Sequence, residues 1–170
     1  MTRRGALAAR RFWTGGILTE IPVDLNRLFR SLGIRVYLHG SGGVDAACSR
    51  LAGRVTLSLN AQMPPPRRRF TAAHELGHLV LGHAPVLPGR PRLAWQEREA
   101  DDFASELLMP AWALRRDSAL LLPPGQRELV LARRFRVSRQ AMGLRLARLG
   151  CLPSPKTEPP PDRSVEALFP

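Results

Sequence analysis

Apolar residues recur at helical spacing over much of the chain and alternate along two short stretches of its first half. Helical spacing predicts helices over 22–32, 67–82, 95–108, 111–118, 125–135 and 138–149. Alternation predicts strands over 34–38 and 54–59. Gly40, Gly42 and Gly43 indicate a turn or hairpin between the two strands. A small strand section followed by helices predicts an α+β domain.

The pattern divides the chain into four segments. We expect a basic leader with a short helix over 1–20, a folded core over 21–118, a helix-turn-helix-like section over 119–152 and a disordered, proline-rich tail over 153–170. No apolar run is long enough to span a membrane, and no signal-peptide core follows the N-terminal arginines. These features favour a reducing, cytoplasmic setting.

The net charge of +12 changes this picture less than the distribution of the charges does. Of the 26 basic residues 25 are arginine, a bias typical of a GC-rich genome that weakens the case for a polyanionic partner. Against this background, residues 97–106 hold five acids and one arginine. This acidic cluster in a basic chain therefore requires a specific explanation. The two cysteines lie far apart, which excludes a disulfide framework and a cysteine-rich zinc finger.

Candidate chemistry begins with His74, Glu75 and His78, which form the pattern H-E-x-x-H. Composition predicts only roughly 0.004 chance matches in a chain of this length. Side chains four residues apart on a helix lie about 40° apart, so both imidazoles can reach one zinc ion. Glu75 is rotated by about 100° from His74 and is placed to act as general base without binding the metal. The competing interpretation is two core histidines bonded to the backbone, with Glu75 paired to an arginine.

A catalytic zinc site needs a third protein ligand. His83 is turned about 140° from the second histidine and can reach the site only if the helix ends before it. On the 95–108 helix, Glu97 and Asp101 lie together at the edge of the apolar face. We therefore expect Glu97 as the ligand and Asp101 as the residue that orients an imidazole, with Glu99 as the alternative ligand. Two other carboxylates of this helix are expected on a solvated face: Asp102 and Glu106.

Two stretches of the chain resemble one family. Residues 69–78 read R-F-T-A-A-H-E-L-G-H, and residues 97–110 read E-R-E-A-D-D-F-A-S-E-L-L-M-P. Both resemble the ImmA/IrrE family of bacterial metallopeptidases, whose patterns are R-F-T-x-A-H-E-L-G-H and E-x-x-A-N/D-x-F-A-x-x-L-L-M-P. The strand that ends at Asn60 and the segment from Phe135 onward also resemble this family, so the similarity covers about residues 20–152.

The resemblance implies a zincin-like metallopeptidase domain with a gluzincin-type site, a small N-terminal sheet, an active-site helix and a helix-turn-helix-like C-terminal section. It places His74, His78 and Glu97 at zinc-ligand positions and Glu75 at the catalytic position. Asp101 stands where the family often has asparagine. The resemblance also implies a protein substrate: a helix-turn-helix (XRE-type) transcriptional repressor, often encoded nearby, whose cleavage derepresses stress-response or mobile-element genes.

The arginine-rich segment near the C-terminus supports a function of another class. A short helix, a turn and Ser138 as the N-cap of the next helix form a helix-turn-helix-like pattern. Four arginines of this pattern are candidates for nucleic-acid or substrate contact: Arg133, Arg134, Arg136 and Arg139. The alternative function is therefore a DNA-binding or repressor-binding regulator with a structural zinc and no peptidase activity.

Overall fold

A computed structural model describes residues 3–40, 44–84 and 92–151 of the chain. Within these ranges the elements are α1 (Arg3–Thr14), α2 (Leu25–Ser31), β1 (Ile34–His39), β2 (Ala46–Leu51), β3 (Arg54–Asn60), α3 (Pro65–Leu81), α4 (Ala94–Leu108), α5 (Ala111–Arg115), the 3-10 helix η1 (Ser118–Leu121), α6 (Gln126–Phe135) and α7 (Arg139–Arg148). The predicted α+β class is confirmed. The expected disordered tail over 153–170 lies outside the described residues.

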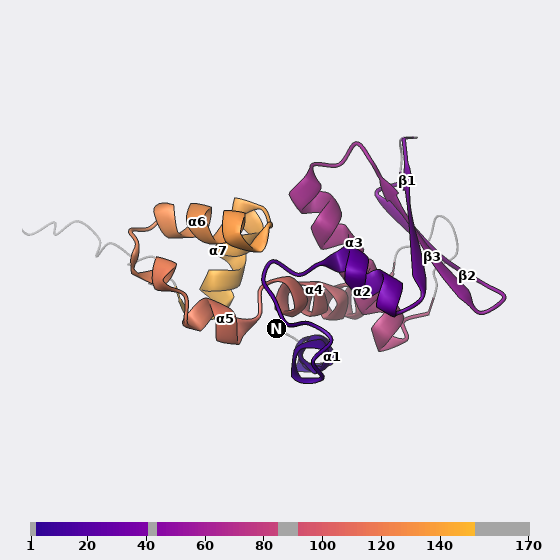
Figure 1. The fold of residues 1–170 in the computed structure, drawn as a ribbon, viewed down its shortest axis with the longest axis horizontal. Helices are drawn as coiled ribbons and strands as arrows, with labels where there is room; N and C mark the ends of the chain where they lie inside the picture. Colours follow the sequence, from indigo (N-terminus) through magenta and orange to yellow (C-terminus); the bar gives the residue numbers. More distant parts are fainter. Residues whose placement is uncertain (1–2, 41–43, 85–91, 152–170) are drawn as a thin grey trace, which may run out of the picture.

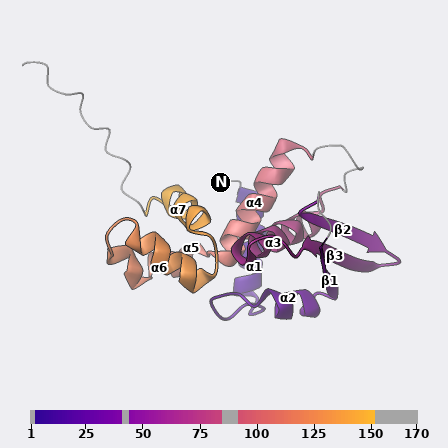
Figure 2. The ribbon, with the colours of Figure 1, turned by 90° about the horizontal axis from the view of Figure 1, so that it is seen from above.

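Helices α3 and α4 lie at the centre of the molecule (Figure 1). The sheet and α2 lie on one side of this pair, and α5, α6 and α7 lie on the other, as the view from above also shows (Figure 2). One apolar core joins these parts and includes Leu57 of the sheet, Leu76 of α3, Phe103 of α4 and Leu146 of α7. The central pair is therefore supported from both sides.

The sheet has three strands in the order β1-β3-β2, with β1 parallel and β2 antiparallel to β3. The two predicted strands are present, but the sequence pattern missed β2. Its residues, A-A-C-S-R-L, lack a strong apolar alternation, and three of the last four are exposed at the sheet edge. A tight hairpin joins β2 to β3 at Ala52 and Gly53, both with positive φ as in a type I′ turn. The two predicted strands are parallel, so no hairpin joins them directly, and Gly42 and Gly43 of the expected turn lie outside the described residues.

Helix α3, which carries the H-E-x-x-H motif, packs very closely against α4. A Cβ atom added to Gly77 would lie 3.1 Å from Phe103 Cδ1 and 3.2 Å from Ala100 Cα. The predicted apolar face of α4 is fully buried at this crossing. A side chain here would force its neighbours to shift by a few tenths of an ångström, so glycine permits this close approach. The close approach in turn sets where the polar edges of the two helices meet.

The segment expected as a basic leader is instead part of the folded unit. Helix α1 packs along α4, and Gly5 lies so close to the backbone of Glu99 that a side chain would clash with it. Phe12 of α1 meets Phe103 edge-on, with ring centroids 5.9 Å apart. The arginines of this segment dominate its sequence pattern, but its apolar residues, among them Ala9 and Phe12, pack in the core.

The carboxylates expected on a solvated face of α4 are also buried. Asp102 and Glu106 are 4% and 1% exposed. Asp102 pairs with Arg148 of α7, and Glu106 pairs with Arg145 of α7 and with Arg10 of α1. The expected face was wrong because α1 and α7 cover it, and their arginines satisfy the buried charges.

Helix termini follow local capping chemistry. Helix α2 starts at Leu25, later than expected, because the Asp24 side chain accepts a hydrogen bond from the backbone N–H of Arg27. Ser138 caps α7 as predicted, accepting from the backbone N–H of Ala141.

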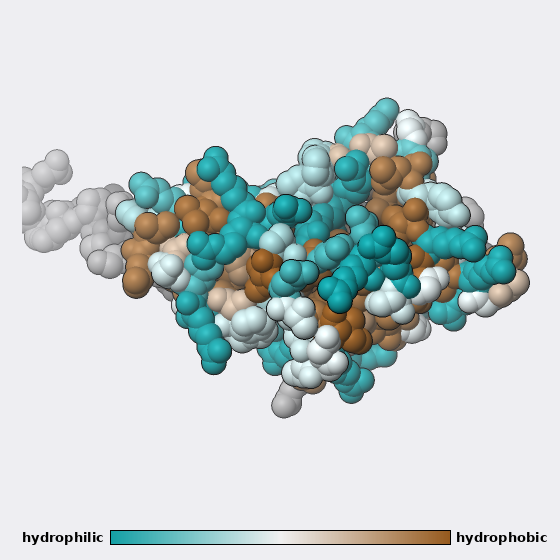
Figure 3. Space-filling view, viewed as in Figure 1, coloured by the Kyte–Doolittle hydropathy of each residue, from teal (hydrophilic) through white to brown (hydrophobic). Residues whose placement is uncertain are grey.

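On the face in Figure 3, hydrophilic and hydrophobic residues are interspersed. In the described ranges, no helix combines the length and the apolar character that crossing a membrane requires.

Candidate metal centre

Three side chains from α3 and α4 converge on one point. The Nε2 atoms of His74 and His78 lie 2.9 Å apart. Glu97 spans the pair, with Oε2 at 3.2 Å from Nε2 of His74 and Oε1 at 3.3 Å from Nε2 of His78. In the described part of the chain, this is the group of His, Cys, Asp or Glu residues that can hold a metal ion. The structure thus brings together the three predicted ligands.

Asp101 determines which nitrogen of His74 faces the cluster. Its Oδ1 atom lies 2.8 Å from Nδ1 of His74. A carboxylate only accepts hydrogen bonds, so His74 donates from Nδ1 and turns the lone pair of Nε2 toward His78 and Glu97. This is the orienting contact expected for Asp101.

The donor set fits a zinc ion. Nitrogen and carboxylate ligands bind zinc at about 2.0–2.2 Å, which in a tetrahedral site separates ligand atoms by about 3.3 Å. The two Nε2 atoms are 2.9 Å apart, and Glu97 approaches them through different oxygens, at 3.2 and 3.3 Å. With one donor atom taken from each residue, the three donors lie within 4.8 Å of one another. Lone pairs so close repel one another unless a cation or a proton lies between them. Three protein donors also leave one tetrahedral position open, which is the arrangement of catalytic sites.

The two histidines differ in their electrostatic surroundings. Burial lowers the pKa of His74, but its hydrogen bond to Asp101 and the nearby carboxylate charges outweigh burial and leave the pKa above its ordinary value. Burial lowers the pKa of His78 to about 3, and the charge of Arg92 adds to this effect. A proton therefore competes with a metal at His74 rather than at His78.

Glu75 lies beside the cluster and not in it. It is buried, and its two carboxylate oxygens face Nη1 and Nη2 of Arg92, each at 3.3 Å. Nη1 of Arg92 is also 4.0 Å from Oε1 of Glu97. Cys48 of β2 is close enough that the charge of Glu75 adds to burial in raising the pKa of its thiol. The competing interpretation expected Glu75 to pair with an arginine, and this part of it is confirmed. The sequence did not indicate which arginine, because Arg92 stands before α4 in no periodic pattern.

The alternative ligand, Glu99, does not join the cluster. Its Oε2 atom lies 3.0 Å from Nε2 of His83 and 3.0 Å from Nη1 of Arg4. On α4 it is two residues from Glu97 and faces the other way, toward α1. The expectation that Glu99 competes as a ligand is therefore corrected by the direction of its side chain.

A cleft opens beside the metal centre, between the start of α3, the middle of α4 and the start of α7. Its volume is about 620 Å³, and its lining includes Phe70, Thr71, Asp101, Ala141 and Leu144. Asp101 belongs to both the cleft and the histidine cluster. An extended polar chain in this cleft would therefore pass next to the convergent donors.

The four arginines of the helix-turn-helix-like section have different surroundings. Arg134 is paired with Asp117, so it is less available than expected. The other three are exposed, and no ion pair holds them within the part of the chain that is described: Arg133, Arg136 and Arg139. All three also line a large open groove against α2 and β1. The structure therefore leaves them accessible to an anionic partner at this groove.

Comparison with known families identifies the same region. The family model described as Peptidase_M78, IrrE N-terminal-like domain, matches residues 29–147. The match begins within α2, covers both metal-centre helices and ends within α7, so it leaves out α1. No curated protein matches the chain.

Proposed function

The chain belongs to the Peptidase_M78 family with its IrrE N-terminal-like domain, and on this basis we propose that it is a zinc-dependent metalloendopeptidase. Membership of the family makes it a peptidase by descent. The proposal adds the metal and the residues. Its main support is the convergence of His74, His78 and Glu97, with Glu75 next to them and outside the donor set.

Each residue has one role in the proposed reaction. His74, His78 and Glu97 hold the ion, and Asp101 keeps His74 in the tautomer that offers Nε2. When bound, zinc supplies Lewis acidity, which polarises the substrate carbonyl and makes water a better nucleophile at neutral pH. Glu75 accepts the proton of the attacking water and passes it to the leaving nitrogen.

We propose a helix-turn-helix (XRE-type) repressor as the substrate, in the cytoplasm where such a repressor works. The similarity to the ImmA/IrrE family supports this substrate class. The cleft beside Asp101 offers a place for an extended segment of it, with an apolar wall that includes Phe70 and Leu144. Cleavage of the repressor would derepress stress-response or mobile-element genes.

The competing function is a DNA-binding or repressor-binding regulator with a structural zinc. Arg133, Arg136 and Arg139 support it, because they are exposed. Two observations favour the peptidase. A structural zinc site takes four protein ligands, whereas three of the described residues converge here. Arg145 of α7 is buried against Glu106 rather than presented to a duplex. Sequence-selective binding of duplex DNA by the full chain would support the competing function.

Zinc content per chain, measured by elemental mass spectrometry, tests the metal site. We expect about one zinc in the wild type and a loss of most of it in Glu97→Ala. The matched control is Arg98→Ala, the next residue on α4, which is exposed and is not one of the grouped donors. A wild type without zinc, even after metal is added back, would refute the proposal.

Incubation of the zinc-loaded protein with a candidate repressor, followed by intact-mass analysis, tests the substrate. We expect one discrete internal cut that a chelator prevents and added zinc restores. A repressor that remains intact with a fully loaded enzyme, across the helix-turn-helix repressors encoded nearby, would contradict this substrate class and leave the metal site standing.

A further inference from the structure

The second histidine of the motif is held by a hydrogen-bond chain that starts on α1. Nδ1 of His78 lies 2.8 Å from Nδ1 of His83, and Nε2 of His83 lies 3.0 Å from Oε2 of Glu99. The same carboxylate oxygen receives a hydrogen bond from Nη1 of Arg4 at 3.0 Å. Arg4 also donates from Nη2 to the carbonyl oxygen of Leu81, at the end of α3.

The donor and the acceptor of each hydrogen bond in this series can be assigned from Glu99 toward His78. Glu99 is a carboxylate and accepts, so His83 donates from Nε2 and keeps a lone pair on Nδ1. That lone pair accepts from Nδ1–H of His78, which leaves Nε2 of His78 unprotonated and facing the cluster. Each hydrogen bond then has one donor and one acceptor. The opposite assignment would require a donor on Glu99.

Backbone geometry brings His83 back to the site. Helix α3 ends at Leu81, and Gly82 takes a left-handed conformation with φ 69°. The backbone N–H of His83 donates to the carbonyl oxygen of His78, the long-range bond of a Schellman motif. The chain therefore reverses, and His83 contacts His78 despite the angle that separates them on a continuous helix.

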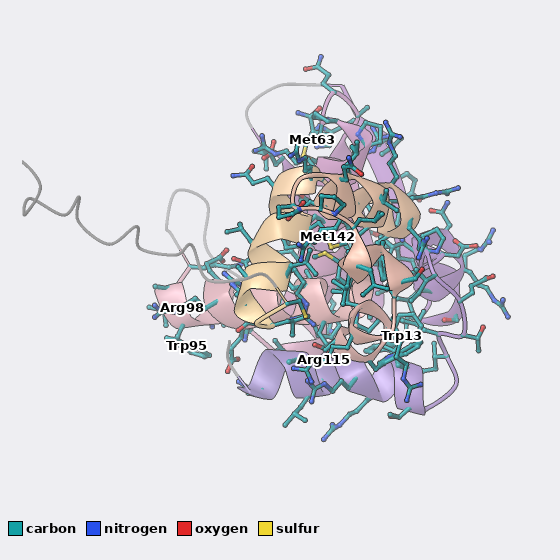
Figure 4. The ribbon with its side chains drawn as sticks, turned by 90° about the vertical axis from the view of Figure 1, so that its left-hand side faces the viewer. Trp13, Met63, Trp95, Arg98, Arg115 and Met142 are labelled. Carbon is teal, nitrogen blue, oxygen red and sulfur yellow. The ribbon has the colours of Figure 1, made fainter. Side chains whose placement is uncertain are left out.

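The middle of this hydrogen-bond series, His83 and Glu99, is buried. The side chains of His83 and Glu99 are 2% and 12% exposed, and Trp95 covers the His83 ring edge-on at 5.5 Å between centroids. In Figure 4, Trp95 and Arg98 lie at one end of α4 and Trp13 of α1 lies toward the other. The contacts of Arg4 and Trp13 with α4 follow in the same order, so α1 runs parallel to α4 and presents Arg4 at the metal-centre end.

We propose that Arg4, Glu99 and His83 form a positioning relay that fixes the tautomer of His78, so that α1, outside the matched family domain, sets the metal affinity of the centre. The proposal rests on the proposed zinc site and deepens it. His74 has its own orienting partner in Asp101, and the relay gives His78 the equivalent support from a different part of the chain.

Zinc affinity, measured by competition with a chromophoric chelator at neutral pH, is the first test. We expect His83→Phe, which keeps a ring but removes the acceptor, to weaken zinc binding by about 10- to 100-fold. Arg4→Gln acts through two further bonds and should weaken it by about threefold to tenfold. The matched control is Arg11→Gln, an exposed arginine of the same helix, which should leave the affinity unchanged.

The double variant His83→Phe with Arg4→Gln tests whether the residues act in series. If they do, the double variant binds zinc as His83→Phe alone does, because Arg4 has no path to His78 without His83. Additive losses, or an unchanged affinity in His83→Phe, would overturn the relay. Arg4 is mostly exposed, so its replacement should leave the folded protein intact.

Nitrogen-15 chemical shifts of the imidazole rings in the metal-free protein report which ring nitrogen carries the proton. A purely structural role of His83 would leave this position unchanged at His78. We expect His78 protonated at Nδ1 and His83 protonated at Nε2 in the wild type, and a loss of the preference at His78 in His83→Phe. A His83 ring protonated at Nδ1 would overturn the proposal. This measurement needs no zinc, so it separates failure of the relay from failure of the proposed peptidase, which a wild type unable to bind zinc would show.

Discussion

At the scale of single residues, the carboxylates of Glu75 on α3 and Glu97 on α4 have different tasks. Glu97 is half-exposed and spans both histidines, whereas Glu75 is buried and faces Arg92. A ligand must point at the ion, whereas a general base must lie next to the ion without binding it. The helix phase of Glu75 and the packing of α4 on α3 provide these two positions.

Replacement Glu75→Gln should separate the two tasks. Glutamine keeps the shape of the side chain and cannot accept the proton, so we expect zinc content to stay at the wild-type level and cleavage to fall by at least about 100-fold. Initial rates with the zinc-loaded variant measure the effect. Wild-type cleavage by this variant would show that Glu75 is not the base.

Arg92 places a positive charge where a metal ion must also be accommodated. Its guanidinium contacts Glu75 and approaches Glu97, and it is only partly exposed. We expect Arg92→Gln to tighten zinc binding by about tenfold, because a repelling charge is removed. Chelator competition measures this, with Arg98→Gln as the control for general loss of an arginine. Weaker binding in Arg92→Gln would instead show that Arg92 holds the carboxylates in place.

At the scale of elements, the closeness of α3 and α4 determines whether the donors meet. A Cβ on Gly77 would lie 3.1 Å from Phe103 and 3.2 Å from Ala100, so these neighbours would have to shift. We expect Gly77→Ala to lower the free energy of unfolding by about 1–3 kcal/mol and to weaken zinc binding, because the helices must separate. Urea denaturation and chelator competition measure the two effects.

The matched control for that replacement lies on α7. A Cβ on Gly143 would meet no atom within 4 Å, so Gly143→Ala should raise the free energy of unfolding by up to about 1 kcal/mol. If Gly77→Ala proved as stable as Gly143→Ala, the helix crossing would be looser than the structure has it.

The start of α2 should depend on pH through its cap. The backbone hydrogen bond from Arg27 holds the pKa of Asp24 below its ordinary value of 3.8. A depressed pKa in the folded state stabilises the protein above the unfolded-state pKa, and this stabilisation is lost as pH falls through the folded-state pKa. We expect Asp24→Asn, which caps without titrating, to remove this component. Urea midpoints of both proteins across the acid range should diverge near neutrality and converge at low pH; parallel curves would contradict it.

At the scale of the whole molecule, buried ion pairs connect the C-terminal helices to the metal-centre helix. Glu106 of α4 and Arg145 of α7 are both about 1% exposed at the side chain. Nε of Arg145 also donates to the carbonyl oxygen of Met109 at 3.0 Å. Through these contacts α7 is part of the fold that positions α4.

Breaking that pair should destabilise the whole fold. We expect Glu106→Gln to lower the free energy of unfolding by about 3–5 kcal/mol, because a buried guanidinium loses its counter-charge. The control Arg67→Gln breaks the pair with Asp45, in which both side chains are exposed, and should cost less than about 1 kcal/mol. Chemical denaturation measures both, and equal effects would show that the burial of the pair carries no weight.

The sequence by itself determined the features that belong to one element. The spacing of His74 and His78, the edge position of Glu97 and Asp101 and the cap at Ser138 all follow from helix periodicity and local hydrogen bonding, and the structure places each of these residues accordingly. Periodicity is a property of consecutive residues, so it is readable without knowing what packs against the helix.

The tertiary structure alone decided which elements meet. That α1 is core and not a leader, that Glu99 faces His83, and that Arg92 reaches Glu75 all depend on contacts between residues far apart in the chain. A helix face rich in acids looks the same in sequence whether water or arginines of other helices cover it. The physical reason is that the direction of a side chain is set locally, while its partner is set by how the helices cross. Here Gly5 and Gly77 permit the close approach of α1 and α3 to α4.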